Sequence, residues 1–539
     1  MTDQQLRTGV LVVGGGTGGV AAALAAARRG AHVVLTTDVP WLGGQLTSQA
    51  VPPDEHPWVE TMGVTASYRA FRDGVREYYR RHYPITDAAR RRPALNPGAG
   101  WVSKLCHEPR VGVAVLDAML APYTSGGRIR VLRDVRPVAT TTDGDRVASV
   151  TLEDTRDGRR TVVEAAYVVD ATELGDLLPL AGAEYVTGFE SQTDTDEPSA
   201  PAQAQPDNVQ AFSVCFAVEH ADGDHTIDRP VRYDHWRAVQ PDFWGGPLLG
   251  WKAPHPRTLE ITERSFSPNP GDDALAVEAD QSRDGGDQNL WTFRRLAARD
   301  LFSPGTYASD ITLVNWPAID YFEHHVLDVD AATAAARVED ARQLSLSMLF
   351  WMQTEAPRPD GGTGWPGLRL RPDVMGTDDG LAQEAYHRES RRILPVTRVV
   401  EQDLSMAVRG THGAVHYRDS VGVGMYRIDL HPSTGGDNYI DVAAEPFELP
   451  LGALVPRRLR NLLAGGKDIG TTHITNGCYR LHPVEWNVGE VAGLLAAECL
   501  AHGREPHEVL EKDDLLEDFQ RLCESEGIER RWPAGLRGY

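Results

Sequence analysis

Residues 9–35 read GVLVVGGGTGGVAAALAAARRGAHVVL and decide the fold of the first part of the chain. The apolar residues 9–13 are typical of a buried strand, and the alanine-rich residues 20–29 after the glycine turn favour a helix that ends at Gly30. Residues 31–35 predict a second strand. Strand, glycine turn, helix and strand in this order open a dinucleotide-binding domain. We therefore expect an α/β protein with a Rossmann-like domain.

The glycine turn contains the pattern GxGxxG at Gly14, Gly16 and Gly19. The first glycine permits a tight turn, the second lets the backbone approach a pyrophosphate, and the third lets the helix pack on the strand. A ribose-binding acid is expected about 20 residues later, at the end of the second strand. That position falls on Thr37, with Asp38 beside it. Either Asp38 binds the ribose hydroxyls after a shift of one residue, or Thr37 makes a weaker neutral hydrogen bond.

The composition argues against several classes of protein. The 539 residues include 77 Asp and Glu and 54 Lys and Arg, so the formal charge is −23. Nucleic acids and anionic membranes reward clustered basic residues, so neither is expected as a partner. The longest apolar run, residues 19–27, is far below the roughly 20 residues of a membrane span, and the N-terminus lacks the pattern of a signal peptide. We expect a cytoplasmic protein whose five widely spread cysteines are reduced.

Changes in sequence character divide the chain into six segments. Arg- and Tyr-rich helical text, an alternating meander with turn signals, a polar stretch and a region rich in Trp and Pro follow one another before the glycine pattern returns. The expected order is a first nucleotide-binding part at 1–56, a helical insert at 57–104, a second nucleotide-binding part with the meander at 105–190, a mobile loop or linker at 191–209, a mixed α+β substrate-binding cap at 210–450 and a last nucleotide-binding part at 451–539.

Four helices outside the first unit are also expected. One begins at Pro109 and runs to about residue 120, and two lie in the cap near residues 331–353 and 379–391. The alanine-rich C-terminal helix is expected at about residues 488–502. Together with the N-terminal unit, this last helix indicates a nucleotide-binding domain built from both ends of the chain.

Several further stretches resemble one known family. They are WLGGQLTSQ at residues 41–49, DATELGDLLPLAG at 170–182, YHRESRRI at 386–393 and NLLAGGKDIGTTHITNGCYRLHPVEWNVGEVAGLLAA at 461–497. In this order they resemble segments of the FAD-dependent oxidoreductases related to the glutathione-reductase and fumarate-reductase flavoproteins. The resemblance implies FAD as cofactor, with non-covalent binding favoured over attachment to Cys106 or Cys478.

The resemblance also implies where FAD contacts the chain. Gly43 and Gly44 would let the backbone pass beside the pyrophosphate and ribityl chain, and Asp468 would lie near the ribityl hydroxyls. The turn at residues 486–489 would begin a helix aimed at the flavin N1 and C2 carbonyl, where a helix N-terminus stabilises the charge of reduced flavin. The remaining members of the implied cofactor site are Gln45, Val135, Asn487 and Gly489.

The chain contains one nucleotide fingerprint. PDGGTGWPG at residues 359–367 has glycines but no preceding strand, so it is interpreted as a loop. A dedicated NAD(P)H domain is therefore not expected. Electrons would come from the substrate itself, from loosely bound NAD(P)H or from a partner reductase.

Candidate catalytic groups lie near the flavin motifs. A histidine near neutral pKa can accept a substrate proton as hydride leaves, and His473 and His56 are the first choices, followed by His107 and His482. Arg480 is expected to bind an anionic substrate group or stabilise an oxyanion, with a structural salt bridge as the alternative. No metal site is expected, because the HxxxH pair His412 and His416 stands in strand and turn text.

The predicted function is an FAD-dependent dehydrogenase or oxidase that transfers hydride from a polar small molecule to flavin N5. Oxygen or another acceptor would reoxidise the flavin, and the substrate is compatible with an anionic group. One alternative is a flavin monooxygenase that uses NAD(P)H or a partner reductase. Another is a non-catalytic flavin-binding protein. The helical insert is expected to offer a surface for a homodimer.

Overall fold

The computed structural model describes residues 4–278 and 289–539. Its central sheet has the strand order β3-β2-β1-β6-β5-β4, with β19 paired to the carboxyl end of β6. The neighbours β3, β2, β1 and β6 are parallel, whereas β4, β5 and β6 form an antiparallel meander. These strands are β1 (Gln4–Val13), β2 (Val33–Thr36), β3 (Ile129–Leu132), β4 (Val135–Asp143), β5 (Arg146–Asp154), β6 (Arg160–Asp170) and β19 (Leu462–Ala464).

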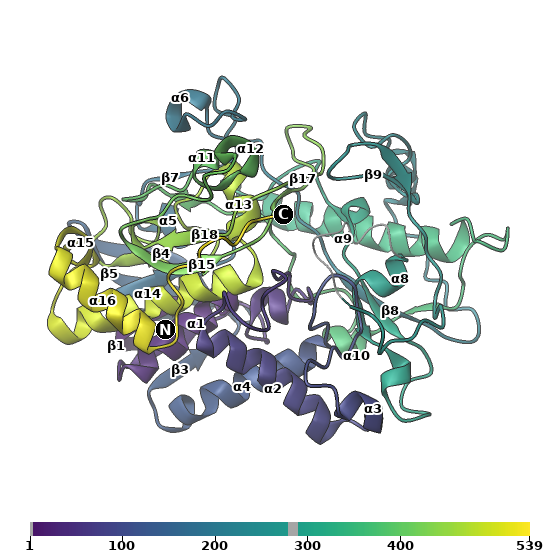
Figure 1. The fold of residues 1–539 in the computed structure, drawn as a ribbon, viewed down its shortest axis with the longest axis horizontal. Coiled ribbons are helices and arrows are strands. Elements are labelled where there is room, and N and C mark those ends of the chain that lie inside the picture. Colours follow the sequence, from purple (N-terminus) through teal and green to yellow (C-terminus); the bar gives the residue numbers. More distant parts are fainter. Residues whose placement is uncertain (1–3, 279–288) are drawn as a thin grey trace.

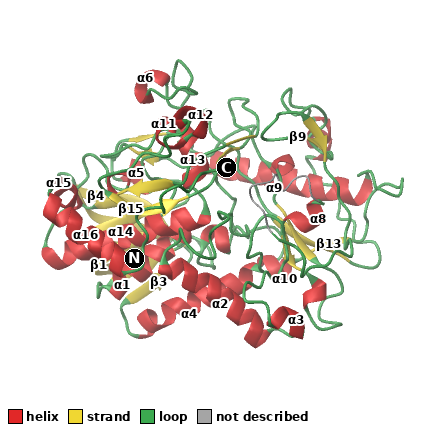
Figure 2. Cartoon of the chain, in the orientation of Figure 1, coloured by secondary structure: helices red, strands yellow, loops and turns green. Residues whose placement is uncertain are grey.

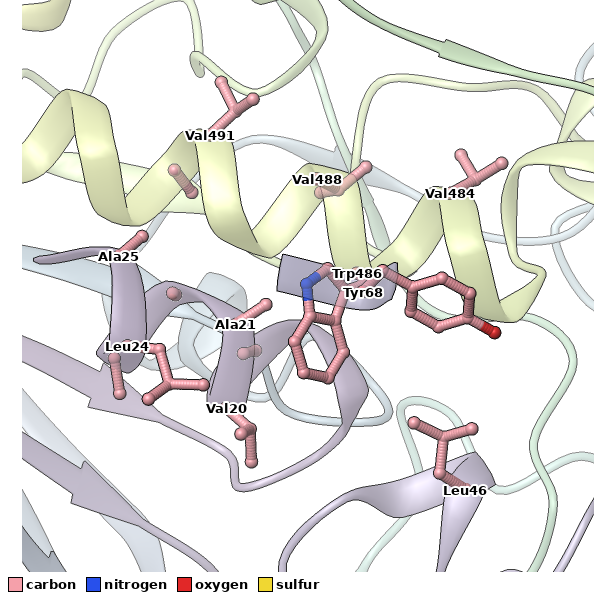
Figure 3. Close-up of a cluster of buried hydrophobic side chains, with 14 of the residues drawn as sticks. Val20, Ala21, Leu24, Ala25, Leu46, Tyr68, Val484, Trp486, Val488 and Val491 are labelled. Carbon is pink, nitrogen blue, oxygen red and sulfur yellow. The ribbon is translucent and has the colours of Figure 1, made fainter. Parts of the chain in front are cut away.

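The two ends of the chain meet on this sheet. Helix α1 (Thr17–Arg28) packs along α14 (His482–His502), and Figure 1 shows the purple N-terminal and yellow C-terminal segments side by side. A Cβ on Gly489 would lie 1.9 Å from the carbonyl oxygen of Gly18, and one on Gly493 would lie 2.1 Å from that of Ala22. The helices therefore touch backbone to backbone, with small apolar side chains around the contact (Figure 3). The expected domain built from both chain ends is confirmed.

The helical insert and the helix after it cover one side of this domain. They are α2 (Ala66–His82), α3 (Asp87–Arg90) and α4 (Pro109–Ser125), as the sequence predicts. Tyr68 and Phe71 of α2 are buried against Trp486 of α14, with ring centroids 5.7 and 5.9 Å away. The insert is thus fixed to the nucleotide-binding domain by aromatic packing.

The cap has its own sheet and core. Four antiparallel strands lie in the order β11-β12-β8-β13, and the long helix α9 (Ala331–Thr354) packs beside them (Figure 2). The strands are β8 (Phe216–His220), β11 (Arg295–Ala297), β12 (Ile311–Val314) and β13 (Leu368–Leu370). The core is aromatic: Trp251 lies 4.8 Å from Trp351 and 5.2 Å from Phe266, between ring centroids. Its buried residues lie between 212 and 385, whereas buried residues from 393 to 449 pack into the core of the nucleotide-binding domain.

The remaining elements are short and complete the two bodies. In chain order they are α5 (Leu177–Leu180), β7 (Tyr185–Val186), α6 (Gln192–Thr195), α7 (Tyr233–Ala238), β9 (Lys252–Pro254), β10 (Ile261–Glu263), α8 (Leu290–Phe293), α10 (Pro372–Met375), β14 (Arg392–Ile393), α11 (Glu401–Leu404), α12 (Met406–Arg409), β15 (Ser420–Gly424), β16 (Ile428–Leu430), β17 (Ile440–Val442), β18 (Phe447–Pro450), α13 (His473–Tyr479), α15 (Pro506–Glu511) and α16 (Asp513–Ser525).

Three expectations about local structure need correction. Residues 379–391 are irregular and not helical, because their backbone pairs with other loops, for example Ser213 with Tyr386. The C-terminal helix begins at His482, six residues before the expected start, because Pro483 suits its first turn and Leu481 has extended backbone. The stretch 191–209 contains helix α6 and the fully buried Glu197, so it is more ordered than its polar composition predicts.

Candidate functional site

The glycines of the fingerprint occupy the turn after β1 as expected. Gly14 has a φ of +103°, which only glycine adopts readily, and a Cβ there would lie 2.1 Å from the carbonyl oxygen of Ala171. A Cβ on Gly19 would lie 1.9 Å from the carbonyl oxygen of Gly14. Gly16 precedes α1 and faces the carboxylate of Glu173. The turn therefore brings bare backbone and a helix N-terminus to one place, as pyrophosphate binding requires.

A cavity of about 270 Å³ opens beside this turn, at the carboxyl ends of β1, β2 and β6. Ligands of open α/β sheets bind at this edge. Predicted residues in its wall are Gly14, Gly16, Thr37, Asp38 and Val135. The wall also contains Arg136 and Glu384, which lie outside the family-like segments, and Glu173 and His387, which lie within two of them but were not predicted as site residues. Glu384 and His387 come from the irregular segment before residue 391.

The side chains of Thr37 and Asp38, the two candidates for the ribose, have different surroundings. The hydroxyl of Thr37 donates to the carbonyl oxygen of Val39 at 3.2 Å, so its proton is engaged locally. The side chain of Asp38 is exposed and lies in the cavity wall. These contacts support Asp38 as the group that accepts hydrogen bonds from ribose hydroxyls.

Acidic side chains in the cavity are partly neutralised. Glu173 forms an ion pair with the buried Lys467, which also donates to the carbonyl oxygen of His387 at 2.9 Å. Burial raises the pKa of Glu384 well above its ordinary value, and the nearby Asp38 and Glu173 raise it further. A protonated Glu384 does not repel a phosphate, so this acidic wall is compatible with a dinucleotide.

The next part of the cradle lies between η1 (Gly44–Leu46) and α14. Gly43 and Gly44 both have positive φ, at 117° and 52°, and a Cβ on Gly44 would lie 2.9 Å from Cα of Gly16. The predicted glycine pair therefore lies against the fingerprint turn. Two buried oxygens without a hydrogen-bond partner among the described residues belong to the predicted cofactor residues here: Oε1 of Gln45 and Oδ2 of Asp468. Oδ1 of Asn487 also lacks such a partner, but its side chain lies against Gly422 of β15. The first two oxygens can accept hydrogen bonds from the hydroxyls of a ribityl chain, so the residues of this place fit FAD.

Two of the implied flavin residues differ from expectation in position. Asn487 and Gly489 lie inside α14, whose N-terminus is His482, so the turn at residues 486–489 does not begin a helix. Gly489 permits the close approach of α1 described above. The N-terminus that could face flavin is therefore that of His482 and Pro483.

His473 stands at the start of α13 in a buried polar network. Its Nδ1 lies 3.0 Å from Oε2 of Glu389, and its ring stacks on Phe189 at 4.3 Å between centroids. Burial raises the pKa of Glu389, but His473 and Arg392 outweigh this and lower it to about 2. His473 thus faces a carboxylate that stays charged, and the surrounding contacts support a structural role.

His56 and His107 are packed as neutral rings. Nε2 of His56 lies 3.1 Å from the carbonyl oxygen of Gly63, and its ring meets Trp532 edge to face. Nδ1 of His107 lies 3.0 Å from the carbonyl oxygen of Glu108. Burial lowers the pKa of each histidine to about 4. These environments also support structural roles.

His482, at the start of α14, contacts the backbone of Asp54. Its Nδ1 accepts a hydrogen bond from the backbone N–H of Asp54 at 3.0 Å, so the ring proton is on Nε2. Burial lowers the pKa of His482 well below its ordinary value. It is therefore a neutral hydrogen-bond donor and a poor proton acceptor.

Arg480 belongs to a cluster of charged and phenolic groups between the nucleotide-binding domain and the cap. Its Nη1 donates to the hydroxyl of Tyr386 at 2.8 Å, and its Nη2 donates to Oδ2 of Asp429 at 2.9 Å. Its carbonyl oxygen accepts a hydrogen bond from Nε2 of Gln45 at 2.9 Å. Arg480, the predicted anion-binding residue, therefore contacts Gln45 of the predicted FAD site directly.

Asp54 and Arg294 extend this cluster. Nη1 of Arg294 lies 3.7 Å from Oδ1 of Asp54, and the hydroxyl of Tyr426 donates to the same oxygen at 3.5 Å. Burial raises the pKa of Asp54 above its ordinary value, and Arg294 only partly opposes this. His431 lies beside the cluster, with Nδ1 2.5 Å from Asp320 and Nε2 3.4 Å from Asp429. We call Asp54, Arg294, Tyr386, Tyr426, Asp429 and Arg480 the interface cluster.

Sequence reasoning found only part of the interface cluster. Asp54 and Arg480 stand near flavin motifs, and Tyr386 opens the family-like YHRESRRI segment. Arg294, Tyr426 and Asp429 carry no motif; Arg294 follows α8, Tyr426 lies in the loop before β16, and Asp429 lies in β16. Arg388 of the YHRESRRI segment pairs with Asp320 at 3.0 Å.

All five cysteines are unpaired and buried, and burial raises the pKa of Cys106 to about 12. Residues 4–278 and 289–539 hold no group of three or more His, Cys, Asp or Glu side chains placed to bind a metal. None of their helices has the length and apolar character required to cross a bilayer.

Comparison with known proteins assigns the family. The family model "FAD dependent oxidoreductase" matches residues 9–522, so the chain belongs to the FAD-dependent oxidoreductase family. A search of curated proteins finds no match.

Solved structures resemble the chain only over part of its length. L-proline dehydrogenase from P. horikoshii is 14% identical over 36% of this chain and 26% of its own, with a TM-score of 0.18. Glycerol-3-phosphate dehydrogenase from Bacillus halodurans, complexed with FAD, is 13% identical over 40% of each chain, with a TM-score of 0.23. OxyS anhydrotetracycline hydroxylase from Streptomyces rimosus is 16% identical over 42% of this chain and 39% of its own, with a TM-score of 0.21. The chain spans less than half the length of each of these three proteins.

Proposed function

Because the chain is an FAD-dependent oxidoreductase, we propose that it acts as a dehydrogenase or oxidase on a polar small molecule. FAD, when bound, supplies a hydride acceptor at its isoalloxazine ring. Gly14, Gly16, Asp38, Gln45 and Asp468 would hold the cofactor by the contacts described above. Non-covalent binding is supported by Cys106 and Cys478, which burial keeps as neutral thiols with raised pKa.

The interface cluster is the observation that carries this proposal. Nε and Nη1 of Arg294 are buried and make no hydrogen bond to any residue in the described ranges, and the nearest carboxylate oxygen of its partner Asp54 is 3.7 Å away. A buried guanidinium with unused donors is costly unless another acceptor satisfies it. A carbonyl, hydroxyl or carboxylate oxygen of a substrate is such an acceptor.

Asp54 is the group that we propose to accept the substrate proton. A general base works best when its pKa approaches the operating pH, and burial moves the pKa of Asp54 in that direction. Arg294 and Tyr426 orient its Oδ1, and His482 accepts its backbone N–H. His473, the first choice from the sequence, has its Nδ1 directed to Glu389 and is the comparison residue in the test.

Arg480 and Tyr386 are proposed to orient the substrate. The bond from Arg480 to Tyr386 makes the phenol oxygen an acceptor and leaves its proton available for donation. Arg480 remains charged at all accessible pH values and is held by Asp429. Burial raises the pKa of Asp429, but His431 and Arg480 outweigh this and lower it below its ordinary range, so this carboxylate stays charged.

Anaerobic stopped-flow mixing tests the function. The FAD-loaded protein is mixed with a panel of hydroxy acids, amino acids and alcohols while flavin absorbance is followed. We expect a subset of these substrates to reduce the flavin quickly, and NADH or NADPH alone to reduce it slowly or not at all. Rapid reduction by NADPH that an organic substrate accelerates would replace this proposal with the monooxygenase alternative. A flavin that no donor reduces would favour a non-catalytic role.

A further inference from the structure

The cavity at the glycine turn has walls from both bodies of the molecule. The nucleotide-binding domain contributes the fingerprint glycines and Asp38, whereas the cap side contributes Val338 of α9 and residues 383–385. Val338 and Ala385 both pack into the aromatic core of the cap. A dinucleotide in this cavity would therefore contact the cap as well as the glycine turn.

Glu384 is an acidic residue of this cap wall, and its position is fixed by Ser48 of the nucleotide-binding domain. The backbone N–H of Glu384 donates to the carbonyl oxygen of Ser48 at 3.4 Å, and that of Gln383 donates to the same oxygen at 3.0 Å. The hydroxyl of Ser48 also donates to Oε2 of Glu384. These bonds hold the Glu384 carboxyl group in the wall of the cavity.

The carboxyl group of Glu384 contacts that of Asp38. Burial raises the pKa of Asp38, and a hydrogen bond between the two carboxyl groups opposes this effect. Two carboxyl groups can form such a bond only when one of them carries a proton. Two charged carboxylates in contact repel each other strongly, so a pair of this kind holds one proton between its members. Burial and the neighbouring acids raise the pKa of Glu384, which makes it the protonated member.

The charged groups around this pair favour a single negative charge on it. Beyond burial, the charges of Asp176 and Glu173 raise the pKa of Asp38. Glu173 also raises the pKa of Glu384, whereas Lys467 acts in the opposite direction. Lys467 is itself paired with Glu173, so it does not stabilise a second charge on the pair. The other titratable side chains of the cavity wall are Arg136 and His387.

We propose that Glu384 shares one proton with Asp38, and that this pair of acids binds the ribose in the nucleotide half of FAD. Asp38 would accept hydrogen bonds from the ribose hydroxyls, and Glu384 would hold the Asp38 carboxylate towards them. The single charge of the pair avoids a second negative neighbour for the pyrophosphate at the glycine turn. Because Glu384 comes from the cap side, FAD would connect both bodies of the molecule. This inference rests on FAD as the cofactor and is independent of the reaction.

Release of FAD from the loaded protein tests the role of Glu384 without any turnover. The protein is diluted and brought to equilibrium, and the fluorescence of free FAD gives the dissociation constant. We expect Glu384→Ala to bind FAD at least about tenfold more weakly than wild type, because Asp38 loses a charge-assisted hydrogen bond. Glu384→Gln should stay within about threefold of wild type, because its amide donates to Asp38 in place of the acid.

The control for these variants is Glu263→Ala. Glu263 is an exposed acid on β10 of the cap and does not line the cavity, so its variant should match wild type. Equal dissociation constants for wild type and Glu384→Ala would overturn the proposal.

A double-mutant cycle separates pairing with Asp38 from a purely structural role of Glu384. Asp38→Asn alone should weaken FAD binding at least about tenfold. In the Asp38→Asn background, Glu384→Ala should add less than about threefold, because the pair is already broken. Thermal unfolding shows that each variant is folded before affinities are compared. Independent effects of the two substitutions would show that Glu384 does not act through Asp38, and would overturn the proposal.

The shared proton has its own signature in the pH dependence of FAD binding. Loss of this proton at higher pH leaves two carboxylates beside the pyrophosphate, whereas Glu384→Gln has no proton to lose at this position. Between pH 6 and pH 9, the affinity of wild type should therefore fall at least about threefold more than that of the variant. Equal pH dependence in the two proteins would contradict a shared proton. If these binding results are as expected while no donor reduces the flavin, the acid pair stands and the proposed reaction fails.

Discussion

Helices α1 and α14 meet backbone to backbone, whereas the elements of the cap are held apart by tryptophan side chains. Gly18 and Gly489 face each other so closely that a single Cβ has no room. In the cap, Trp251 alone contacts Phe266, Trp316, Trp351 and Trp365. The first arrangement tolerates no added atom, because a carbonyl oxygen in a helix cannot move aside. The second is built from side chains, which can adjust to a ligand or a substitution.

This contrast suits the two tasks of the molecule. A dinucleotide is the same in every member of the family, and a rigid backbone turn recognises it. A substrate differs among enzymes, and we have proposed that side chains from the cap help to recognise it. The following predictions test whether rigidity and adjustability are divided in this way.

The largest expected effect is that of Gly489→Ala. Its Cβ would lie 1.9 Å from the carbonyl oxygen of Gly18, so α1 and α14 must separate and the fingerprint turn moves with α1. We expect loss of folded protein with bound FAD, measured by soluble yield and by the ratio of flavin to protein absorbance. Gly246→Ala is the matched control, because a Cβ there meets nothing within 4 Å. Full FAD occupancy in Gly489→Ala would show that this interface is as adjustable as the cap.

The second effect concerns proton transfer. Asp54→Asn removes the proposed proton acceptor and keeps the shape of the side chain, so flavin reduction by substrate should slow by about 10²- to 10⁴-fold while FAD remains bound. His473→Asn should keep the reduction rate within a few-fold of wild type. Stopped-flow reduction across pH measures both. The reverse result would restore His473 as the base.

The third effect is on stability and is expected in acid. The pKa of His107 is about 4 in the folded protein and near 6.5 when unfolded, so the unfolded chain binds its proton first as pH falls. This difference in pKa contributes about 3 kcal/mol to the free energy of unfolding. The contribution is fully present above pH 6.5 and is lost progressively as the pH falls towards 4.

Urea unfolding of His107→Gln between pH 7 and pH 4 checks this contribution. The variant should lose less stability on acidification than wild type does. The exposed His82→Gln serves as control and should follow wild type. Identical pH dependence in wild type and His107→Gln would mean that His107 is solvated or charged in the folded protein.

The smallest expected effect is that of Arg480→Met. Loss of a charge-assisted hydrogen bond costs about 2 kcal/mol, so the affinity for an anionic substrate should fall about 30-fold with FAD retained. Arg458→Met removes an arginine that pairs with Glu184 and Asp145 on the surface and should leave the affinity unchanged. Substrate titration of the bound flavin measures both. An unchanged affinity in Arg480→Met would leave Arg480 with a structural role only.

Much of the nucleotide-binding domain could be predicted because its signals are local. Gly14 and Gly43 need positive φ, Gly19 needs room for a carbonyl oxygen, and each requirement selects glycine at one position. The helix from residue 331 was predicted for the same reason, since its length and composition favour one state. Residues 379–391 were mispredicted as a helix because their backbone is satisfied by partners far along the chain, which no local pattern records.

By itself, the sequence determined the cofactor fold: one strand, one glycine turn and one helix specify a phosphate-binding backbone wherever they occur together. Only the tertiary structure decided which side chains form the interface cluster. Asp54, Arg294 and Asp429 lie in three distant segments and become neighbours only when the chain folds. Burial also lowers the pKa of His56 and His107, and burial is a property of the whole fold that no local pattern records.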